Sequence, residues 1–276
     1  MGIFAAVPTK SALKKALKKG YVTVDDAPGT TATFIRGGEI IRLRIPDGAD
    51  EGTRLVFPLA VLFEDDHLAV IRKPAGILVN GNTFKTVANA LGQNLARSPL
   101  PEASKPQPVH RLDYATTGCL LVGKTSTCIR ALNRLFREKA VEKTYYAVTI
   151  GEMQGQGEIT AEIDGKEARS GYEVKKSVPS ARFGTLNLVK LTPETGRRHQ
   201  LRKHLSVSGN PILGDRDYGR APLILKGKGM YLHAFSLRFV HPVTGEEMLI
   251  EDALPPRFRK LFPGADTTGC SDNSVI

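Results

Sequence analysis

The stretch PVHRLDYATTGCLLV, residues 108–122, combines a clear fold signal with a clear chemical signal. Its apolar half, Cys119 to Val122, is typical of a buried strand, and Gly118 permits a sharp turn into that strand. The half before it is polar, which predicts that Asp113 lies on a loop beside the strand. Aspartates in such loops most often cap a turn with a local hydrogen bond, so a catalytic role for Asp113 needs support from other segments.

Two later segments carry further chemically active side chains. In KTYYAVTIG, residues 143–151, the alternation of a strand places Tyr145 and Tyr146 on opposite faces of a sheet. In TGRRHQLRKHL, residues 195–205, basic side chains and histidines follow one another without an acid. Because so dense a positive cluster repels itself, we expect a bound anion or a carboxylate from another segment beside it.

The composition predicts a basic, globular protein with a polyanionic partner. The 276 residues include 39 Lys and Arg against 28 Asp and Glu, which gives a formal net charge of +11. A hydrophobic content of 41% is enough to fill the core of one large domain with a small module attached. Nucleic acid is therefore the first candidate for the partner.

Cysteine usage and hydropathy bear on the cellular compartment. The 3 cysteines form neither a CxxC pair nor an even set, which argues against a structural zinc site and against a disulfide framework. No stretch reaches the roughly 18 apolar residues that span a bilayer, and the apolar start of the chain is too short for a signal peptide. We expect a cytoplasmic protein with no contact to a membrane, and we expect it to be a monomer.

The sequence divides into three parts. Residues 1–57 form a small basic module, residues 58–263 a large domain, and residues 264–276 a polar tail that we expect to be disordered. In the large domain, residues 86–96 and residues 126–139 have the periodicity of amphipathic helices.

The small module carries a cluster of positive charge. We predict a helix from its N-cap Ser11 to a stop at Gly20, and a half-buried strand from Ile41 to Ile45 with a basic outer face. The lysine-rich helix, with GYVTVDD at 20–26 and IIRLRIP at 40–46, is similar to the S4-like RNA-binding domain, first described in the fourth protein of the small ribosomal subunit. RNA binding is therefore expected from Lys14, Lys15, Lys18 and Lys19.

Five motifs of the large domain together resemble the RluA-like family of pseudouridine synthases. They are KPAG at 73–76, HRLD at 110–113, the K-x-Y segment at 143–145, the basic cluster at 195–205 and NPILGDRDYG at 210–219. Their order over about 200 residues, from Leu59 to Phe262, makes a chance match improbable. The resemblance implies an α+β fold with a mixed, largely antiparallel sheet, flanking helices and a central active-site cleft.

The resemblance also assigns roles to residues of this chain. The HRLD aspartate of the family, here Asp113, is catalytic, and the preceding Arg111 helps to displace the target base. Tyr145 packs on the extruded base and is a candidate for proton removal, and Arg202 pairs with the catalytic carboxylate. Further substrate contacts are expected from His110, Arg197, His199, Gln200 and Lys73. Thr117 stands where the family mostly has Ser, and Arg198 where it has Thr or Ser.

The implied reaction explains why an aspartate would be needed. Pseudouridine formation breaks the bond between uracil and ribose, turns the base and rejoins it through carbon, which requires neither a cofactor nor a metal. Breaking a bond to an anomeric carbon builds positive charge that Asp113 can stabilise or capture, so Asp113 acts as a nucleophile or as a base on the sugar. The expected substrate is structured RNA, ribosomal RNA first and transfer RNA next, with the uridine extruded from its stack.

Other functions remain open at this level. A non-catalytic RNA-binding or ribosome-assembly factor that retains the synthase fold is the main alternative. A metal-dependent hydrolase using His110, Asp113, His199 and His204 is a third possibility. It is disfavoured because the HxxxxH spacing of His199 and His204 is not HExxH, and no acid lies between these two histidines. A glycosidase would need a second carboxylate across the scissile bond, and no paired-acid motif stands out.

Overall fold

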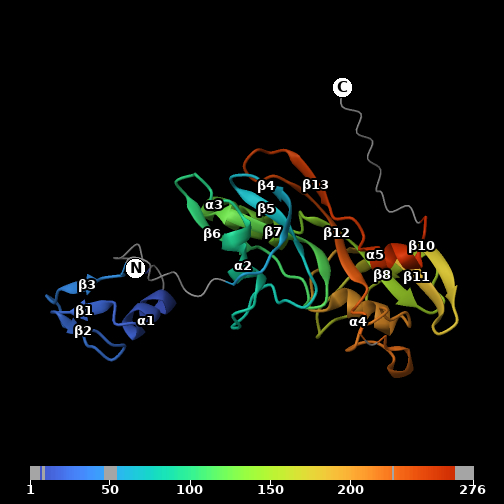
Figure 1. The fold of residues 1–276 in the computed structure, drawn as a ribbon, viewed down its shortest axis with the longest axis horizontal. Helices are drawn as coiled ribbons and strands as arrows, with labels where there is room; N and C mark the ends of the chain where they lie inside the picture. Colours follow the sequence, from blue (N-terminus) through green and yellow to red (C-terminus); the bar gives the residue numbers. More distant parts are fainter. Residues whose placement is uncertain (1–6, 8–9, 47–54, 226, 265–276) are drawn as a thin grey trace. The chain divides into compact units, whose positions relative to one another are not determined.

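The computed structural model describes residues 7, 10–46, 55–225 and 227–264. It divides the chain into two compact units, residues 1–54 and residues 55–276 (Figure 1). The division after Arg54 lies close to the boundary predicted after residue 57. Residues 47–54 of the predicted small module and all of the predicted tail after Gly264 fall outside the described residues. No helix among the described residues is long and apolar enough to cross a bilayer.

The described residues of the smaller unit form one helix, α1 (Lys10–Lys18), and three short strands, β1 (Val22–Val24), β2 (Ala27–Pro28) and β3 (Ile41–Leu43), paired antiparallel in the order β2-β1-β3. Gly20 ends the helix as predicted, because its φ of 70° lets Gly20 and Tyr21 donate their N–H groups to Leu17 and Ala16. The predicted N-cap is wrong, since Ser11 lies inside α1.

The β3 strand was predicted in the right place but with too much burial. Ile41 and Ile45 are 36% and 40% exposed, and only Leu43 between them is half-buried. Within the described part of this unit, the buried hydrophobic side chains are Ala16 and Val22. One short helix and three short strands offer too little surface to cover a full apolar face of β3.

The larger unit is built on one mixed sheet, in which ten strands are described. Its path is β4-β5-β7-β12-β8-β11-β10-β9, with β13 paired to β12 and β6 to β7. The strands are β4 (Ala60–Glu64), β5 (Leu68–Lys73), β6 (Ala103–Pro108), β7 (Thr117–Thr125), β8 (Glu142–Ile150), β9 (Gln156–Ile159), β10 (Ser170–Ser180), β11 (Gly184–Pro193), β12 (Leu232–Val240) and β13 (Glu247–Glu251). The pairs are antiparallel except β7 with β12, so the sheet is mixed and largely antiparallel, as predicted.

The parallel pair β7 and β12 lies at the centre of this sheet. Gly118 has a φ of 112°, and a Cβ atom there would lie 2.1 Å from the carbonyl oxygen of Ala234. A larger residue would therefore push the two strands apart. The close approach places the loop that precedes β7, and with it Asp113, beside the first half of β8, where Tyr145 pairs with Ala234.

Helices cover both faces of the sheet (Figure 1), and the hydrophobic core forms separate clusters where the helices pack on it. The helices are α2 (Val87–Asn94), α3 (Ser126–Arg137), α4 (Gln200–Val207) and α5 (Pro256–Leu261), with a 3-10 turn, η1, at Ala221–Leu223. Leu201 and Leu205 of α4 pack with Ala147 and with Tyr145. Tyr146 packs in a different cluster, with the α5 side chains, so the two tyrosines lie on opposite faces as predicted.

Candidate active site

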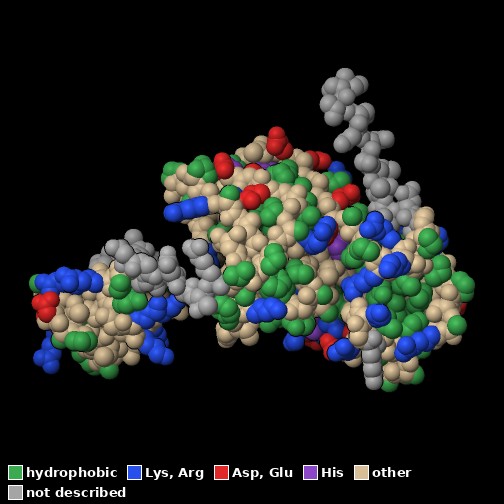
Figure 2. All heavy atoms as spheres, viewed as in Figure 1, with side chains coloured by type: hydrophobic (Ala, Val, Ile, Leu, Met, Phe, Trp, Pro, Cys, Tyr) green, Lys and Arg blue, Asp and Glu red, His purple; other side chains and the backbone are tan. Residues whose placement is uncertain are grey.

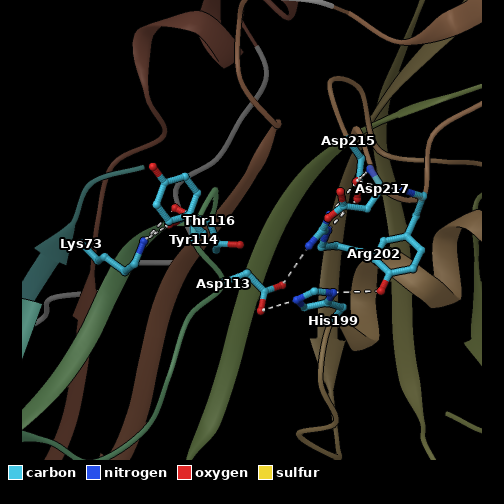
Figure 3. Close-up of polar contacts among 9 residues, drawn as sticks. Lys73, Asp113, Tyr114, Thr116, His199, Arg202, Asp215 and Asp217 are labelled. Atoms are coloured by element: carbon cyan, nitrogen blue, oxygen red, sulfur yellow. Dashed lines mark hydrogen bonds and ion pairs between the residues drawn. The ribbon is translucent and has the colours of Figure 1, made fainter. Parts of the chain in front are cut away.

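A cavity of about 550 Å³ opens on the larger unit. Its wall comes from five places: the loop at 109–113 with Thr116, the end of α3 with the residues after it, the start of β8, residues 193–202, and Leu232 at the start of β12. Asp113, Tyr145 and Arg202, the predicted catalytic residues, all line it. Segments far apart in the sequence therefore bring the three predicted groups to one cavity, and Figure 3 shows two of them, Asp113 and Arg202.

Lys73 stabilises the loop that contains Asp113 through hydrogen bonds to backbone carbonyl groups. Its ammonium group donates to the carbonyl oxygens of Pro74 at 2.9 Å, Thr116 at 3.0 Å and Tyr114 at 3.2 Å (Figure 3). Burial lowers the pKa of Lys73 to about 8, and the negative charge of Asp113 opposes that shift. The side chain is 0% exposed and does not line the cavity, so its contacts are with the protein, and the predicted contact of Lys73 with the substrate stays a prediction.

The Asp113 carboxylate lies close to two nitrogen-bearing side chains that line the same cavity. Its Oδ1 lies 3.7 Å from Nε2 of His199, and its Oδ2 lies 3.8 Å from Nη1 of Arg202. Both distances are longer than a hydrogen bond, and the Asp113 side chain keeps 18% of its surface exposed. The carboxylate is therefore held near positive charge with its oxygens still accessible from the cavity.

Arg202 is bound first of all by Asp215 and Asp217. Its Nε and Nη2 donate to the two Asp215 oxygens at 2.7 Å each, and Nη2 also donates to Asp217 at 2.7 Å. Burial alone would lower the pKa of Arg202, but these hydrogen bonds raise it well above its ordinary value. Arg202 does pair with Asp113 as predicted, but as the longer contact of a guanidinium fixed by two other carboxylates.

His199 comes directly before α4 and has a left-handed backbone with φ of 56°. Its Nδ1 lies 2.9 Å from the hydroxyl of Tyr218, and its Nε2 is the atom that faces Asp113. Burial lowers the pKa of His199, assisted by the charges of Arg202 and Arg198 and opposed by that of Asp113. The imidazole is therefore neutral near pH 7.

Tyr145 and His110 lie on the wall beside Asp113. Burial, and after it the charge of Asp113, raises the pKa of Tyr145 above that of a free tyrosine, so its phenol is protonated at neutral pH. The His110 ring stacks on Phe136 at 4.7 Å, and its Nε2 accepts the N–H of Leu121. Burial lowers the pKa of His110 to about 3, so a neutral His110 fixes the loop to β7.

The other side chains predicted to contact the substrate differ in whether they already have hydrogen-bond partners within the protein. Gln200 is buried and uses its amide to bind Thr195, Arg197, Arg169 and Ser170, which fixes the turn into α4. Arg197 donates from Nε to the carbonyl oxygen of Glu167, and Lys203 pairs with Asp164. The guanidinium groups of Arg111 and Arg198 line the cavity without a hydrogen bond or ion pair to any residue within the described ranges.

The metal-site alternative gains no support from the described residues, among which no three His, Cys, Asp or Glu side chains are grouped to bind an ion. His204, one of its four proposed ligands, is buried and bound to Ser170 and to the carbonyl oxygen of Ala161.

The comparisons with known proteins identify the family. A sequence model described as RNA pseudouridylate synthase matches residues 67–207, which contain Asp113, Tyr145 and Arg202. The chain is 34% identical to ribosomal large subunit pseudouridine synthase D of Nitrosomonas europaea, over 90% of this chain and 77% of that one. The chain belongs to the RluA-like family of RNA pseudouridine synthases. This synthase is also 32% identical to ribosomal large subunit pseudouridine synthase C of Escherichia coli K12, over 88% of this chain and 84% of that one.

Solved structures agree with the fold of the synthase. It superposes on human RNA pseudouridylate synthase domain containing 1 with a TM-score of 0.60 and 25% identity, over 74% of this chain and 86% of that one. For human RNA pseudouridylate synthase domain containing 4 the TM-score is 0.58 and the identity 27%, over 72% and 90%. The pseudouridine synthase fold is therefore shown for the larger unit.

Three polar residues of the site were missed at the sequence level. Asp215, Asp217 and Tyr218 belong to the quoted NPILGDRDYG motif but were given no role. The signal was the acid-free basic cluster at 195–205, which required a carboxylate nearby without indicating which one.

Proposed function

We propose that this pseudouridine synthase acts on structured RNA, with ribosomal RNA of the large subunit as its substrate, and that Asp113 is its catalytic carboxylate. The observation that carries the proposal is the position of Asp113: its oxygens are open to the cavity while two nitrogen groups stand behind them. The substrate class follows the relatives synthase D and synthase C, both of which are ribosomal large subunit enzymes by name.

Asp113 is suited to a reaction that builds positive charge on the sugar. A carboxylate beside the anomeric carbon stabilises or captures that charge while the base is detached. Arg202 and His199 stand beside the Asp113 carboxylate without covering it, because neither is within hydrogen-bond distance. The protein thereby supplies a preorganised charge instead of recruiting one during the reaction.

Tyr145 forms the wall against which the extruded base packs. Its raised pKa means that the phenol can accept a proton from carbon only by giving up its own. Asp113, whose charge contributes to that raised pKa, is the anionic group at hand to receive the phenol proton. We propose that Tyr145 and Asp113 share the last proton transfer in this way.

RNA would be held by positive charges outside the reaction centre. Arg111 and Arg198 are unpaired at the cavity within the described part of the chain, so both are available to phosphates. Figure 2 shows further Lys and Arg side chains gathered over the part of the larger unit that contains β12, α5 and β11. In the smaller unit, Lys14, Lys15 and Lys18 are exposed on α1 and Lys19 is exposed directly after it, and we propose that they contact RNA as well.

We also propose that the protein acts as a monomer in the cytoplasm. The two cysteines within the described ranges, Cys119 and Cys128, are free and buried thiols. Burial raises the pKa of each to about 12, which makes them unreactive, as expected for a protein of a reducing compartment.

The test compares Asp113→Asn with Asp66→Asn, which changes an exposed aspartate of the loop after β4. Pseudouridine is mapped in total RNA from cells that have only one form of the protein. We expect Asp113→Asn to lose modification while the purified protein still binds RNA, and Asp66→Asn to keep both. Modification at the wild-type level by Asp113→Asn would refute the catalytic assignment, and modified sites confined to transfer RNA would refute the substrate class.

A further inference from the structure

The contact between His199 and Asp113 depends on which ring nitrogen of His199 carries the proton. A neutral imidazole has one N–H and one lone pair, and the hydrogen bond at one nitrogen decides the state of the other. Here Nδ1 lies 2.9 Å from the Tyr218 hydroxyl, and Nε2 lies 3.7 Å from Oδ1 of Asp113.

Electrostatics favours one of the two tautomers. With the proton on Nε2, an N–H dipole points at the Asp113 carboxylate and Nδ1 accepts the hydroxyl proton of Tyr218. With the proton on Nδ1, the Nε2 lone pair would face the carboxylate and repel it. A phenol that donates to Nδ1 therefore selects the tautomer whose Nε2–H points at the Asp113 carboxylate.

Tyr218 is itself held firmly enough to make this selection. Its backbone N–H donates to Asp215 at 3.2 Å, and its carbonyl oxygen accepts the hydroxyl of Ser206 in α4 at 2.7 Å. The guanidinium of Arg202 lies 4.8 Å above its ring. The segment from Asp215 to Tyr218 thus contacts both nitrogen groups that face Asp113 (Figure 3).

The backbone of His199 adds an independent observation. A φ of 56° is uncommon for a residue other than glycine and is costly unless the surroundings enforce it. Because His199 stands at the entry to α4, this conformation turns its ring toward Tyr218 and Asp113. The contact with Tyr218 is one of the interactions that can hold it there.

We propose that Tyr218 is a positioning residue for catalysis: its hydroxyl fixes His199 as the Nε2–H tautomer, with that N–H directed at the Asp113 carboxylate. The proposal rests on the proposed function in one respect, the catalytic role of Asp113. It adds that the imidazole acts on the carboxylate, so His199 differs from the substrate contact predicted from the sequence.

The first experiment reads the tautomer directly and needs no turnover. Nitrogen NMR of the full-length protein labelled with ¹⁵N-histidine distinguishes a protonated from an unprotonated Nε2, and His199→Gln assigns the His199 signals. We expect the Nε2–H form in the wild type and a mixture of both tautomers in Tyr218→Phe, which removes the hydroxyl but keeps the ring above which Arg202 lies. A wild-type Nδ1–H form, or an unchanged tautomer in Tyr218→Phe, would overturn the proposal.

The second experiment measures turnover on RNA. Loss of one hydrogen bond of about 1 kcal/mol predicts a fall in kcat of roughly fivefold for Tyr218→Phe, with KM unchanged. Tyr172→Phe, which removes a hydroxyl from β10 of the same unit, is the matched control and should keep the wild-type kcat. In a His199→Gln background the side chain has no tautomers, so adding Tyr218→Phe should cause no further loss.

The two proposals fail in different ways. Full activity of Asp113→Asn would remove the catalytic role of Asp113 whatever the tautomer of His199. An inactive Asp113→Asn together with wild-type kcat in Tyr218→Phe would leave the proposed function intact and refute the role of Tyr218 alone. An equal loss in Tyr218→Phe with and without His199→Gln would also refute it, because the hydroxyl would then act by another route.

Discussion

Replacing Arg202 by methionine should unfold the larger unit more readily, because the main partner of this arginine is buried. The Asp215 side chain is 1% exposed and receives two hydrogen bonds from Arg202. Methionine fills similar space but leaves the Asp215 carboxylate without a positive partner. Removing one member of a buried ion pair costs about 3–5 kcal/mol of unfolding free energy, since the remaining charge keeps its desolvation penalty.

The measurement is urea denaturation followed by circular dichroism, since the chain has no tryptophan. With a dependence of about 3 kcal/mol per molar urea, the expected loss lowers the midpoint by roughly 1–2 M. Asp217→Asn is the matched control: that carboxylate binds the same guanidinium but its side chain is 63% exposed, so its loss should cost less than about 1 kcal/mol. A midpoint for Arg202→Met within 0.3 M of the wild type, a shift of about 1 kcal/mol, would refute the reasoning.

The same contacts change how loss of activity in Arg202→Met should be interpreted. An inactive Arg202→Met protein could be inactive because the Asp215 segment has collapsed. Arg202→Lys separates the causes, because lysine keeps a positive charge but cannot form the two-pronged contact with Asp215. We expect Arg202→Lys to be intermediate in stability and to recover part of the turnover.

Two further predictions concern positive charges, one on the buried side chain of Lys73 and the other on the surface of the smaller unit. Replacing Lys73 by methionine leaves three carbonyl groups of the Asp113 loop without their donor and should cost about 2–4 kcal/mol at pH 7, measured by urea denaturation. The folded protein binds fewer protons at Lys73 than the unfolded chain between pH 8 and 10.5, so the stability of the wild type relative to Lys73→Met should rise with pH in that window; a relative loss there would contradict the burial of the ammonium. Changing Lys14, Lys15, Lys18 and Lys19 together to Gln should reduce the slope of log affinity against log salt by up to about 3, and an unchanged slope would leave α1 without a role in RNA binding.

The sequence predicted the parts of the site that depend on local pattern. The change from polar to apolar residues around Gly118 placed Asp113 on a loop before a strand, and alternation placed Tyr145 and Tyr146 on opposite faces. Both are properties of a few consecutive residues, and strand geometry follows from such runs. The helix stop at Gly20 was predictable for the same reason.

The sequence failed where a side chain meets a partner from a distant segment. Lys73 was expected to contact substrate, but its ammonium ends among carbonyl groups of residues 74, 114 and 116. Arg202 does pair with Asp113, but its nearer partner Asp215, which lies 13 positions along the chain, was not predicted. These outcomes depend on how closely β5, β7 and β12 approach, which no single segment encodes.

The contacts around Asp113 divide the positive charges of the site into two groups with different tasks. Arg202, Arg197 and Lys203 already have partners, so an RNA phosphate would gain little from them without displacing Asp215, the Glu167 carbonyl or Asp164. Arg111 and Arg198 have no partner among the described residues and can bind a phosphate without breaking another contact. We therefore expect affinity for RNA to depend on the unpaired arginines and the chemistry on the paired one, and we expect Arg198, where the family usually has Thr or Ser, to alter RNA choice.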